Sequence, residues 1–340
     1  MKKLTTLMAS AVLMAGAANA GELSLQNAFP KGLALVGPSA DYFADLVRVS
    51  TGNEIDFKHY GSGELSPPAD IVDNVGSGAL DAGWSYAAYT AGKAPAVTLF
   101  GTIPFGPDAR KYLTWIHRGG GLELWAEIYE PFNVVPMPCG VTLAESGGWF
   151  NDPIETVDDF QGLKMRMGGI GGQVIAKLGA SAQSLPAGEI YTSLETGRLD
   201  ATEFSFPEID ALLGFNKIVK NYYFPGWHQP AGLTELTINK DLWNGWSDDQ
   251  RNIIINACKA TTLEFLELHA AKQHEVLATF VETGVTIRRF PDAVLAALHT
   301  AADEVYAEES AKDPMFKKVY DSYQAFSANY DSYVNLNDIN

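Results

Sequence analysis

One arginine lies where the chain could capture an anion. Arg166 belongs to the apolar stretch 163–167, which leads directly into the glycine-rich run 168–172 and a helix-like segment at 173–178. A guanidinium group binds a carboxylate or phosphate through two parallel hydrogen bonds, and a helix N-terminus adds free N–H donors. The pattern indicates an anion site at Arg166, with a surface-lying arginine as the alternative. The glycine spacing is not G-x-G-x-x-G, so we expect no organic cofactor.

Two acidic residues have surroundings that favour a cation site. Glu203 is followed by Phe204, and Glu145 lies in a glycine-rich stretch that ends with Trp149 and Phe150. Gln229 could supply a neutral oxygen. Carboxylate, amide and backbone oxygens are hard ligands that suit Na⁺, Ca²⁺ or Mg²⁺ rather than zinc. The alternative for each acid is a solvated loop residue.

Catalytic motifs are absent from the sequence. Neither G-x-S-x-G nor H-E-x-x-H occurs. We expect His228, beside Trp227, to be structural rather than a base, and His269 and His274 to lie on a solvated helix surface. The sequence therefore favours a binding protein over an enzyme.

A segment that occurs twice, 119 positions apart, indicates two similar lobes. Residues 67–82 and 186–201 each carry a proline, an acidic residue, apolar residues at helical spacing, a glycine and then Leu-Asp-Ala. Each copy predicts a short helix, a glycine stop and a strand. Ligands of open α/β sheets bind beyond the carboxyl ends of strands, so the residues after each Asp-Ala should face a cleft between the lobes.

Aromatic residues near these strand ends are candidates for the walls of that cleft. They would otherwise be ordinary core residues. The candidates are Trp84, Tyr86, Tyr89, Trp149 and Phe204.

The remaining pattern is that of an α/β protein. Alternating residues at 23–28 and 54–60 predict strands, and they flank a helical pattern at 39–49. Long helical stretches are predicted at 248–280 and at 292–323, the second interrupted near Pro314.

The N-terminal segment and the net charge limit the class of protein to which the chain can belong. Residues 1–20 have two lysines, an apolar stretch and a small-residue cleavage site, which predicts a signal peptide and an exported, periplasmic protein. Without these residues, which hold no acid, the net charge falls from −17 to −19. That charge repels nucleic acid and anionic membranes, so we expect neither as a partner. A chain of this length is expected to form two domains.

Two cysteines remain, Cys139 and Cys258. An exported protein can keep a disulfide, but Cys139 lies in a strand-like stretch and Cys258 in a helix-like run. A bridge and two buried small side chains are both open, and the second is favoured.

Several of these motifs together resemble the extracytoplasmic solute receptors of TRAP transporters. Within that family the chain is most similar to the branch that binds 2-oxo or 2-hydroxy monocarboxylates with a cation. The motifs that carry the resemblance are Pro138-Cys139-Gly140, Gly147-Gly148-Trp149-Phe150, 163–169, Leu199-Asp200-Ala201-Thr202-Glu203 and Phe224-Pro225-Gly226-Trp227.

The resemblance implies a two-lobe periplasmic binding protein fold, with crossover strands at the hinge and long C-terminal helices. Lobe I would comprise 21–138 plus about 233–270, and lobe II 139–232 plus about 271–340. The lobes would close around the ligand by rotation near Pro138 and Leu233, and the closed form would dock on the membrane subunits of the transporter. Long C-terminal helices mediate dimers in this branch, so a monomer and a homodimer are both open.

The resemblance also implies roles for individual residues. Arg166 would clamp the ligand carboxylate. Glu203, the backbone carbonyl of Phe204 and the side chain at position 145 would bind the cation, which in turn would contact ligand oxygens. The oxo-acid branch has an amide at position 145, whereas this chain has Glu145.

That second acid bears on the identity of the ion. Glu145, Glu203 and the ligand carboxylate outweigh Arg166 by two negative charges, which a divalent ion neutralises. We therefore predict one cation, Ca²⁺ rather than Na⁺, and a small acid such as lactate or pyruvate.

Two competing hypotheses remain. The first is the same class of receptor with a wider cavity that takes a sugar acid, an aldonate or uronate. The second is a periplasmic metal-dependent lyase or hydrolase that uses Glu203 as a base.

Overall fold

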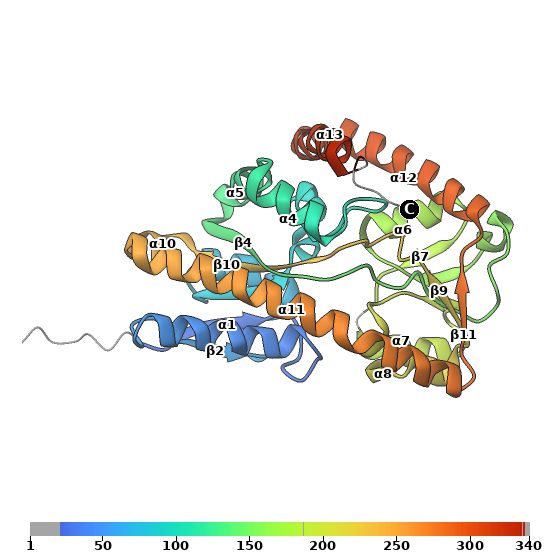
Figure 1. Ribbon diagram of the computed structural model, residues 1–340, viewed down its shortest axis with the longest axis horizontal. Helices are drawn as coiled ribbons and strands as arrows, with labels where there is room; N and C mark the ends of the chain where they lie inside the picture. Colours follow the sequence, from blue (N-terminus) through green and yellow to red (C-terminus); the bar gives the residue numbers. More distant parts are fainter. Residues whose placement is uncertain (1–20, 186, 335, 337–340) are drawn as a thin grey trace, which may run out of the picture.

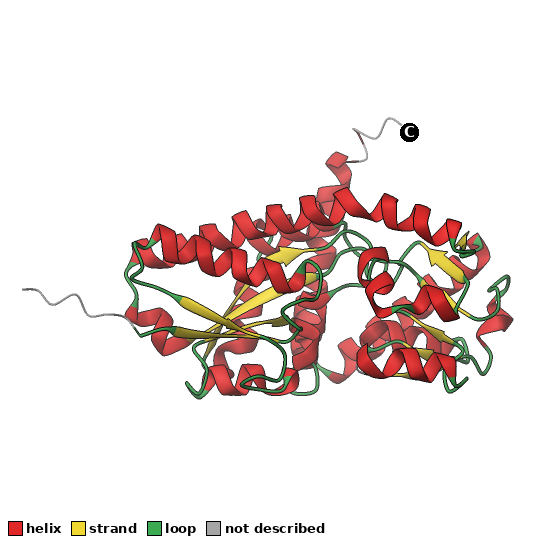
Figure 2. Cartoon of the chain, turned by 90° about the horizontal axis from the view of Figure 1, so that it is seen from below, coloured by secondary structure: helices red, strands yellow, loops and turns green. Residues whose placement is uncertain are grey.

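Two separate β-sheets form the centres of the two halves of the molecule (Figures 1 and 2). The computed structural model describes residues 21–185, 187–334 and 336, so the predicted signal peptide lies outside the described residues. Among those described, no helix combines the length and apolar character needed to cross a membrane.

The first sheet has the strand order β2-β1-β3-β10-β4 and the second β11-β9-β5-β8-β6-β7. The first contains β1 (Leu23–Asn27), β2 (Phe57–Tyr60), β3 (Ala82–Tyr86), β4 (Val134–Val141) and β10 (Leu233–Asn239). The second contains β5 (Gly148–Phe150), β6 (Lys164–Arg166), β7 (Ser181–Gln183), β8 (Ala201–Thr202), β9 (Asn221–Phe224) and β11 (Thr286–Arg289).

The sequence repeat occupies equivalent positions in the two sheets. Strand β3 lies between parallel β1 and antiparallel β10, and β8 lies between parallel β6 and antiparallel β5. Gly78 and Gly197 have φ of +76° and +69°, a conformation that side chains disfavour. Asp81 and Asp200 each accept a hydrogen bond from a backbone N–H of the parallel neighbour, at 2.7 and 3.0 Å. The prediction of a two-lobe α/β fold is confirmed.

Helices cover both faces of each sheet. The shorter ones are α1 (Val36–Ser50), α2 (Ile71–Gly76), α3 (Thr98–Gly101), α4 (Ala109–Arg118), α5 (Gly121–Tyr129), α6 (Gly169–Lys177), α7 (Ala187–Glu195), α8 (Pro207–Leu213), α9 (Phe215–Ile218) and α10 (Lys240–Gly245). The long ones are α11 (Asp248–Glu282), α12 (Asp292–Lys312) and α13 (Pro314–Val334). The long helices begin where the sequence predicts and break before Pro314 as predicted, but the last one continues past the predicted end at 323 to Val334.

The chain crosses between the sheets at 142–147 and returns at 225–232. The two crossing segments are hydrogen-bonded to each other, Thr142 N–H to Gly232 O at 2.9 Å and Glu145 N–H to Gln229 O at 3.1 Å. Helix α11 is a third connection, because it contacts β4 and α1 with one half and α8 and β11 with the other (Figure 1).

The last two helices divide their contacts between the halves of the molecule. Helix α12 packs on α6, whereas α13 packs on α4 and α5. The predicted lobe boundaries assign α13 to lobe II and α4 and α5 to lobe I. The boundaries stay a prediction, and α13 bridges the two sets of residues that they separate.

The two cysteines form a disulfide, Cys139 in β4 with Cys258 in α11. The favoured expectation of two unbridged cysteines was wrong. Helix α11 lies directly against β4 and brings the two Cα atoms within 4.3 Å, a proximity that sequence spacing does not reveal. The bond fixes the first half of α11 to the first sheet.

Removing this bond should destabilise the protein. In the Cys139→Ala/Cys258→Ala variant the unfolded chain loses a constraint that spans 119 residues, and we expect a loss of about 3 to 5 kcal/mol in unfolding free energy. Urea denaturation with and without dithiothreitol measures it. Wild type in dithiothreitol should have the same urea midpoint as the variant, and dithiothreitol should not change the midpoint of the variant. Equal midpoints for oxidised wild type and variant would contradict the expectation.

A buried acid lies at an irregularity of β10. Glu235 is fully buried at the register shift between Thr234 and Glu235. Its Oε2 accepts a hydrogen bond from the Tyr129 hydroxyl at 3.0 Å, and its Oε1 has no hydrogen-bond partner among the described residues. Burial raises the pKa of Glu235 to about 8, and the bond from Tyr129 offsets this only in part. The side chain is therefore protonated at neutral pH.

Glu235 should make the stability of the protein pH-dependent. Its folded pKa of about 8 lies above the ordinary 4.5, so the folded state keeps a proton that the unfolded state loses between these values. Its contribution to the unfolding free energy is complete below the lower value and falls as pH rises, by at most about 1.4 kcal/mol per pH unit. The Glu235→Gln variant should not show this decrease, so its unfolding free energy should increase relative to that of wild type as pH rises. Urea unfolding from about pH 5 to about pH 8 compares the two proteins, with exposed Glu123→Gln as control; parallel profiles would contradict the assignment.

Candidate functional site

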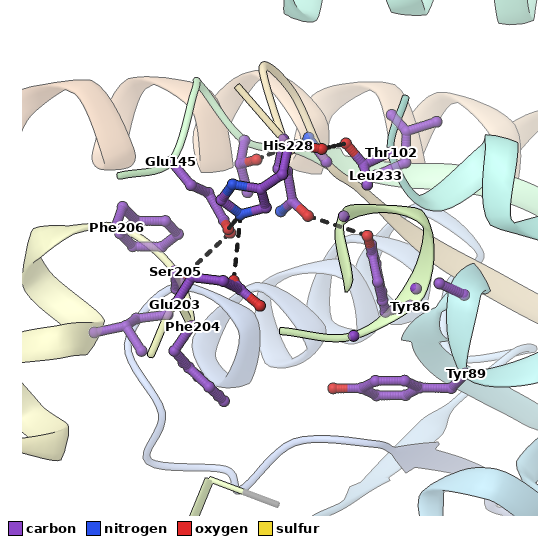
Figure 3. A pocket seen from close by; sticks show the side chains of 18 of the residues that line it. Tyr86, Tyr89, Thr102, Glu145, Glu203, Phe204, Ser205, Phe206, His228 and Leu233 are labelled. Carbon is purple, nitrogen blue, oxygen red and sulfur yellow. Dashed lines mark hydrogen bonds and ion pairs between the residues drawn. The ribbon is translucent and has the colours of Figure 1, made fainter. Parts of the chain in front are cut away.

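A cavity of about 250 Å³ lies between the two sheets, beside the crossing segments (Figure 3). The first half of the molecule contributes the loop before α1 with the first residue of that helix, the last residue of β3 and residues that follow it. The second contributes Arg166, the glycine-rich run 168–171 and residues 203–206. Of the residues that follow each Asp-Ala, Tyr86, Glu203, Phe204 and Ser205 line this cavity, whereas Trp84 and Ser85 do not.

Two buried carboxylates and an imidazole meet in this cavity. Nε2 of His228 is 3.3 Å from Oε2 of Glu203 and 3.6 Å from Oε2 of Glu145. All three side chains are buried: Glu145 is 5% exposed, Glu203 7% and His228 5%. Figure 3 shows the imidazole pointing toward both carboxylates, which come from different parts of the chain. Their ligand atoms lie within 4.8 Å of one another, a group that could hold a metal ion.

Arg166 completes the cluster. Its Nη1 donates to Oε1 and to the backbone oxygen of Glu203, both at 2.7 Å, and its guanidinium lies 5.1 Å from the ring centroid of Phe204. The strand register explains the contact, because Arg166 in β6 is paired with Thr202 in β8 and Glu203 follows directly. The alternative of a surface-lying arginine is therefore excluded.

The cluster shifts the protonation of its members. Burial disfavours a charged imidazole, but contacts with Glu145 and Glu203 outweigh it and raise the pKa of His228 to about 9. Burial also raises the pKa of Glu145, and contacts with His228 and Ser205 offset this increase in part. For Glu203 burial is outweighed by Arg166 and His228, so its pKa is lowered. At neutral pH Arg166 and an imidazolium at His228 therefore compensate the buried carboxylates.

A close backbone approach positions Glu145. A Cβ atom at Gly226 would lie 2.2 Å from the backbone oxygen of Glu145, so only glycine allows the two crossing segments this separation. The Glu145 side chain accepts a hydrogen bond from Ser205 Oγ at 3.2 Å.

Gln229 and two of the tyrosines predicted as cleft walls line the same cavity. Gln229 lines it, and its Oε1 accepts a hydrogen bond from the Tyr86 hydroxyl at 3.1 Å. Tyr89 lines it next to Tyr86, and Figure 3 shows both rings across the cavity from His228.

Two predicted wall residues lie elsewhere. Trp84 is inside β3 beneath α1, with its ring 5.6 Å from that of Phe43, whereas Tyr86 is at the open end of the strand. Trp149 stacks on Tyr222 at 3.9 Å and donates to Asp210 at 2.9 Å. Neither tryptophan lines the cavity, because helices cover the sheet faces to which they belong.

The histidine predictions also need correction. His228, expected to be structural, lies between the two acids, and its only signal in the sequence is the neighbouring candidate Gln229. His269, expected on a solvated surface, is 1% exposed and packs its ring 3.8 Å from that of Phe206, and burial lowers its pKa to about 4. His274 is exposed as predicted.

Fold and site together define a two-lobe solute-binding protein, and comparison with known proteins identifies the family. Residues 30–313 match the DctP family, described as bacterial extracellular solute-binding protein, family 7. The monocarboxylate 2-oxoacid-binding periplasmic protein of Nostoc sp. strain PCC 7120 is 34% identical over 287 residues, 84% of this chain and 79% of the relative.

Solved structures agree with this match. A TRAP periplasmic solute-binding protein from Colwellia psychrerythraea, with bound calcium and pyruvate, is 32% identical with a TM-score of 0.88 and covers 93% of this chain and 96% of its own. One from Pseudoalteromonas atlantica, with bound sodium and pyruvate, is 30% identical with a TM-score of 0.84 and the same coverage. Proteins with bound uronates are 20 and 21% identical and share the fold alone.

The chain belongs to the DctP family of TRAP transporter solute-binding proteins. It is a receptor for transport and not an enzyme, because the family consists of such receptors. The family binds small organic acids and works with membrane permease subunits. The resemblance inferred from the motifs is confirmed.

The close approach at Gly226 predicts the effect of a single methyl group. Gly226→Ala should force the crossing segments apart, lower stability by about 1 to 3 kcal/mol and weaken ligand binding, because Glu145 moves with its backbone. Gly245→Ala is a matched control, since nothing lies within 4 Å of its Cβ position. Thermal unfolding and ligand titration of both variants measure the effect. Equal behaviour of the two variants would refute this role of Gly226.

Proposed function

We propose that this protein captures a 2-oxo or 2-hydroxy monocarboxylate together with a divalent cation in the periplasm and delivers the acid to the TRAP membrane subunits. The observation that carries the proposal is the contact of one guanidinium, Arg166, with Glu203, one of two buried neighbouring carboxylates in a cavity whose other walls are mainly apolar. The 34% identical 2-oxoacid-binding relative supports the same ligand class.

The presence of one guanidinium group in the lining of the cavity favours a ligand with one carboxylate. Arg166 is the only lysine or arginine among the described residues that line the cavity. His228 faces the two acids of the protein, so a second ligand carboxylate would have no further guanidinium or ammonium group to pair with, and burying it unpaired would be costly. In the proposed complex Arg166 holds the carboxylate of the acid by a bidentate contact.

Apolar side chains in the lining of the cavity favour an apolar ligand side chain. Phe29, Leu33 and Val36 line the cavity from one half of the molecule, and Phe204 and Phe206 from the other. These side chains offer no hydrogen-bond partner to the hydroxyl groups of a sugar acid. The cavity volume of about 250 Å³ is more than pyruvate or lactate needs, so a ligand side chain longer than methyl also has space, and the choice against a sugar acid rests on the apolar lining and not on the volume.

The proposed cation ligands are the carboxylates of Glu145 and Glu203, supported by the backbone oxygen of Phe204 and the side chain of Gln229. His228 changes the charge balance that the sequence suggested. With His228 neutral, a divalent ion and Arg166 balance the two acids and the ligand carboxylate. With His228 protonated, a monovalent ion would suffice. We propose the divalent state, with Ca²⁺ as the reference ion, because a cation beside Nε2 opposes protonation there.

The cation and the acid should bind cooperatively. Without a cation the Arg166 guanidinium contacts Glu203, the residue that we propose as a cation ligand. Cation binding draws Glu203 away and leaves a guanidinium edge free for the acid. Rotation of the lobes about the crossing segments 142–147 and 225–232 then encloses both.

Calorimetric titration of the mature protein, stripped by chelation, tests the proposal. We expect 2-oxo and 2-hydroxy acids with short apolar side chains to bind with Ca²⁺ present and at least about a hundredfold more weakly without it, a coupling of about 2.7 kcal/mol. Arg166→Lys should lose about tenfold or more in acid affinity but keep Ca²⁺ binding, because lysine has charge without the guanidinium fork.

Three results would overturn parts of the proposal. Full-affinity binding in Na⁺ buffer after chelation would exclude the divalent ion. Binding of uronates but of no short acid would replace the ligand class. Unchanged acid affinity in Arg166→Lys would remove Arg166 as the carboxylate ligand.

A further inference from the structure

His228 has a feature that a structural histidine lacks. It is 5% exposed, yet neither ring nitrogen makes a hydrogen bond to any described residue. Buried polar groups are nearly always hydrogen-bonded, so an imidazole without such bonds suggests a partner of another kind. The nearest oxygens to Nε2 belong to Glu203 and Glu145, at ion-pair distances of 3.3 and 3.6 Å.

The main chain holds His228 in place. Thr102 Oγ1 donates to the backbone oxygen of His228 at 3.3 Å, and the Phe105 N–H donates to the backbone oxygen of Trp227 at 2.7 Å. The Trp227 ring stacks on Phe105 with centroids 5.6 Å apart. These contacts orient the imidazole toward the carboxylates (Figure 3) without using its nitrogens.

The spacing suits a shared cation. Neighbouring ligands of one ion lie about 3 to 3.5 Å apart when each metal–ligand bond is about 2.0 to 2.4 Å. The separations from His228 Nε2 to the two carboxylates are close to this range. A neutral Nε2 has a lone pair for a metal, and the three side chains approach it from two crossing segments and the end of β8.

An imidazole also changes which ions the site favours. Two carboxylates with amide and backbone oxygens form a hard set for Ca²⁺ or Na⁺. Adding a nitrogen ligand favours first-row divalent ions, which bind imidazole well, over Ca²⁺, which prefers oxygen.

We propose that Nε2 of His228 is a direct ligand of the bound cation, and that the set Glu145, Glu203 and His228 accepts first-row divalent ions such as Mn²⁺ at the position where Ca²⁺ binds. This inference rests on the proposed function for the location of the cation. It adds a ligand that the all-oxygen set lacks and predicts a different order of metal affinities.

Electron spin-echo envelope modulation of the full chain loaded with Mn²⁺ alone is the direct test, because a directly bound imidazole couples its ¹⁴N nucleus to the metal. We expect this modulation in wild type and in His299→Gln, a control for an exposed histidine outside the cluster. His228→Gln should abolish it. Excess Ca²⁺ should release the Mn²⁺ and with it the signal.

Calorimetry adds a second readout. His228→Gln offers an oxygen in place of nitrogen, so Mn²⁺ affinity should fall at least about tenfold while Ca²⁺ affinity changes by less than about threefold. Circular dichroism verifies that the variant is folded. The spin-echo modulation of wild type tests the inference even if the variant does not fold.

The outcomes separate this inference from the proposed function. Mn²⁺ that Ca²⁺ displaces but that shows no ¹⁴N coupling would overturn the role of His228 and leave the receptor proposal intact. Mn²⁺ that excess Ca²⁺ does not displace and whose ¹⁴N modulation persists in His228→Gln would lie elsewhere, which also overturns the inference. Coupling in wild type without any acid binding would support His228 as a ligand while the proposed function fails.

Discussion

The burial of two neighbouring carboxylates is the constraint on which the site depends. Ionised carboxylates are costly to remove from water, and two close together repel each other. Glu145 and Glu203 are both buried and both face His228, while Arg166 contacts Glu203. The two cationic side chains compensate the acids in the absence of a ligand. In the proposed complex, a cation and an organic acid that enter together would exchange these contacts for new ones without leaving the cluster strongly charged.

The architecture brings this cluster together from separate parts of the chain. Arg166 and Glu203 lie at the ends of neighbouring strands of the second sheet, whereas Glu145 and His228 lie on the two segments that cross between the sheets. Tyr86 comes from the end of a strand in the first sheet and contacts Gln229 on a crossing segment. Neither half of the molecule contains the whole site, so ligand binding is linked to how the two sheets are placed.

The connections between the two halves differ in the contacts that make them. Helix α11 is fixed to the first sheet by the Cys139–Cys258 bond and continues to the second. The C-terminal helices join both halves, and one hydrophobic cluster runs from Trp125 beside the first sheet through Met165 of the second to Phe316 in α13. The two crossing segments meet through backbone hydrogen bonds, and Trp227 and Ala231 of the returning segment belong to the same hydrophobic cluster.

Local patterns in the sequence determined the fold class and the central residues of the site. The repeat predicted two similar lobes because a helix, a glycine stop and a strand have short-range signals. Arg166 and Glu203 were found because Arg166 lies at the end of one strand pattern and Glu203 follows another, and strand ends meet at one edge of a sheet. Only the tertiary structure decided the cysteine pairing, the burial of His269 and the place of His228 between the acids, since each depends on segments far apart in the chain. It also decided the positions of Trp84 and Trp149, because helices cover both faces of these sheets and side-chain alternation then does not reveal which residues meet the cavity.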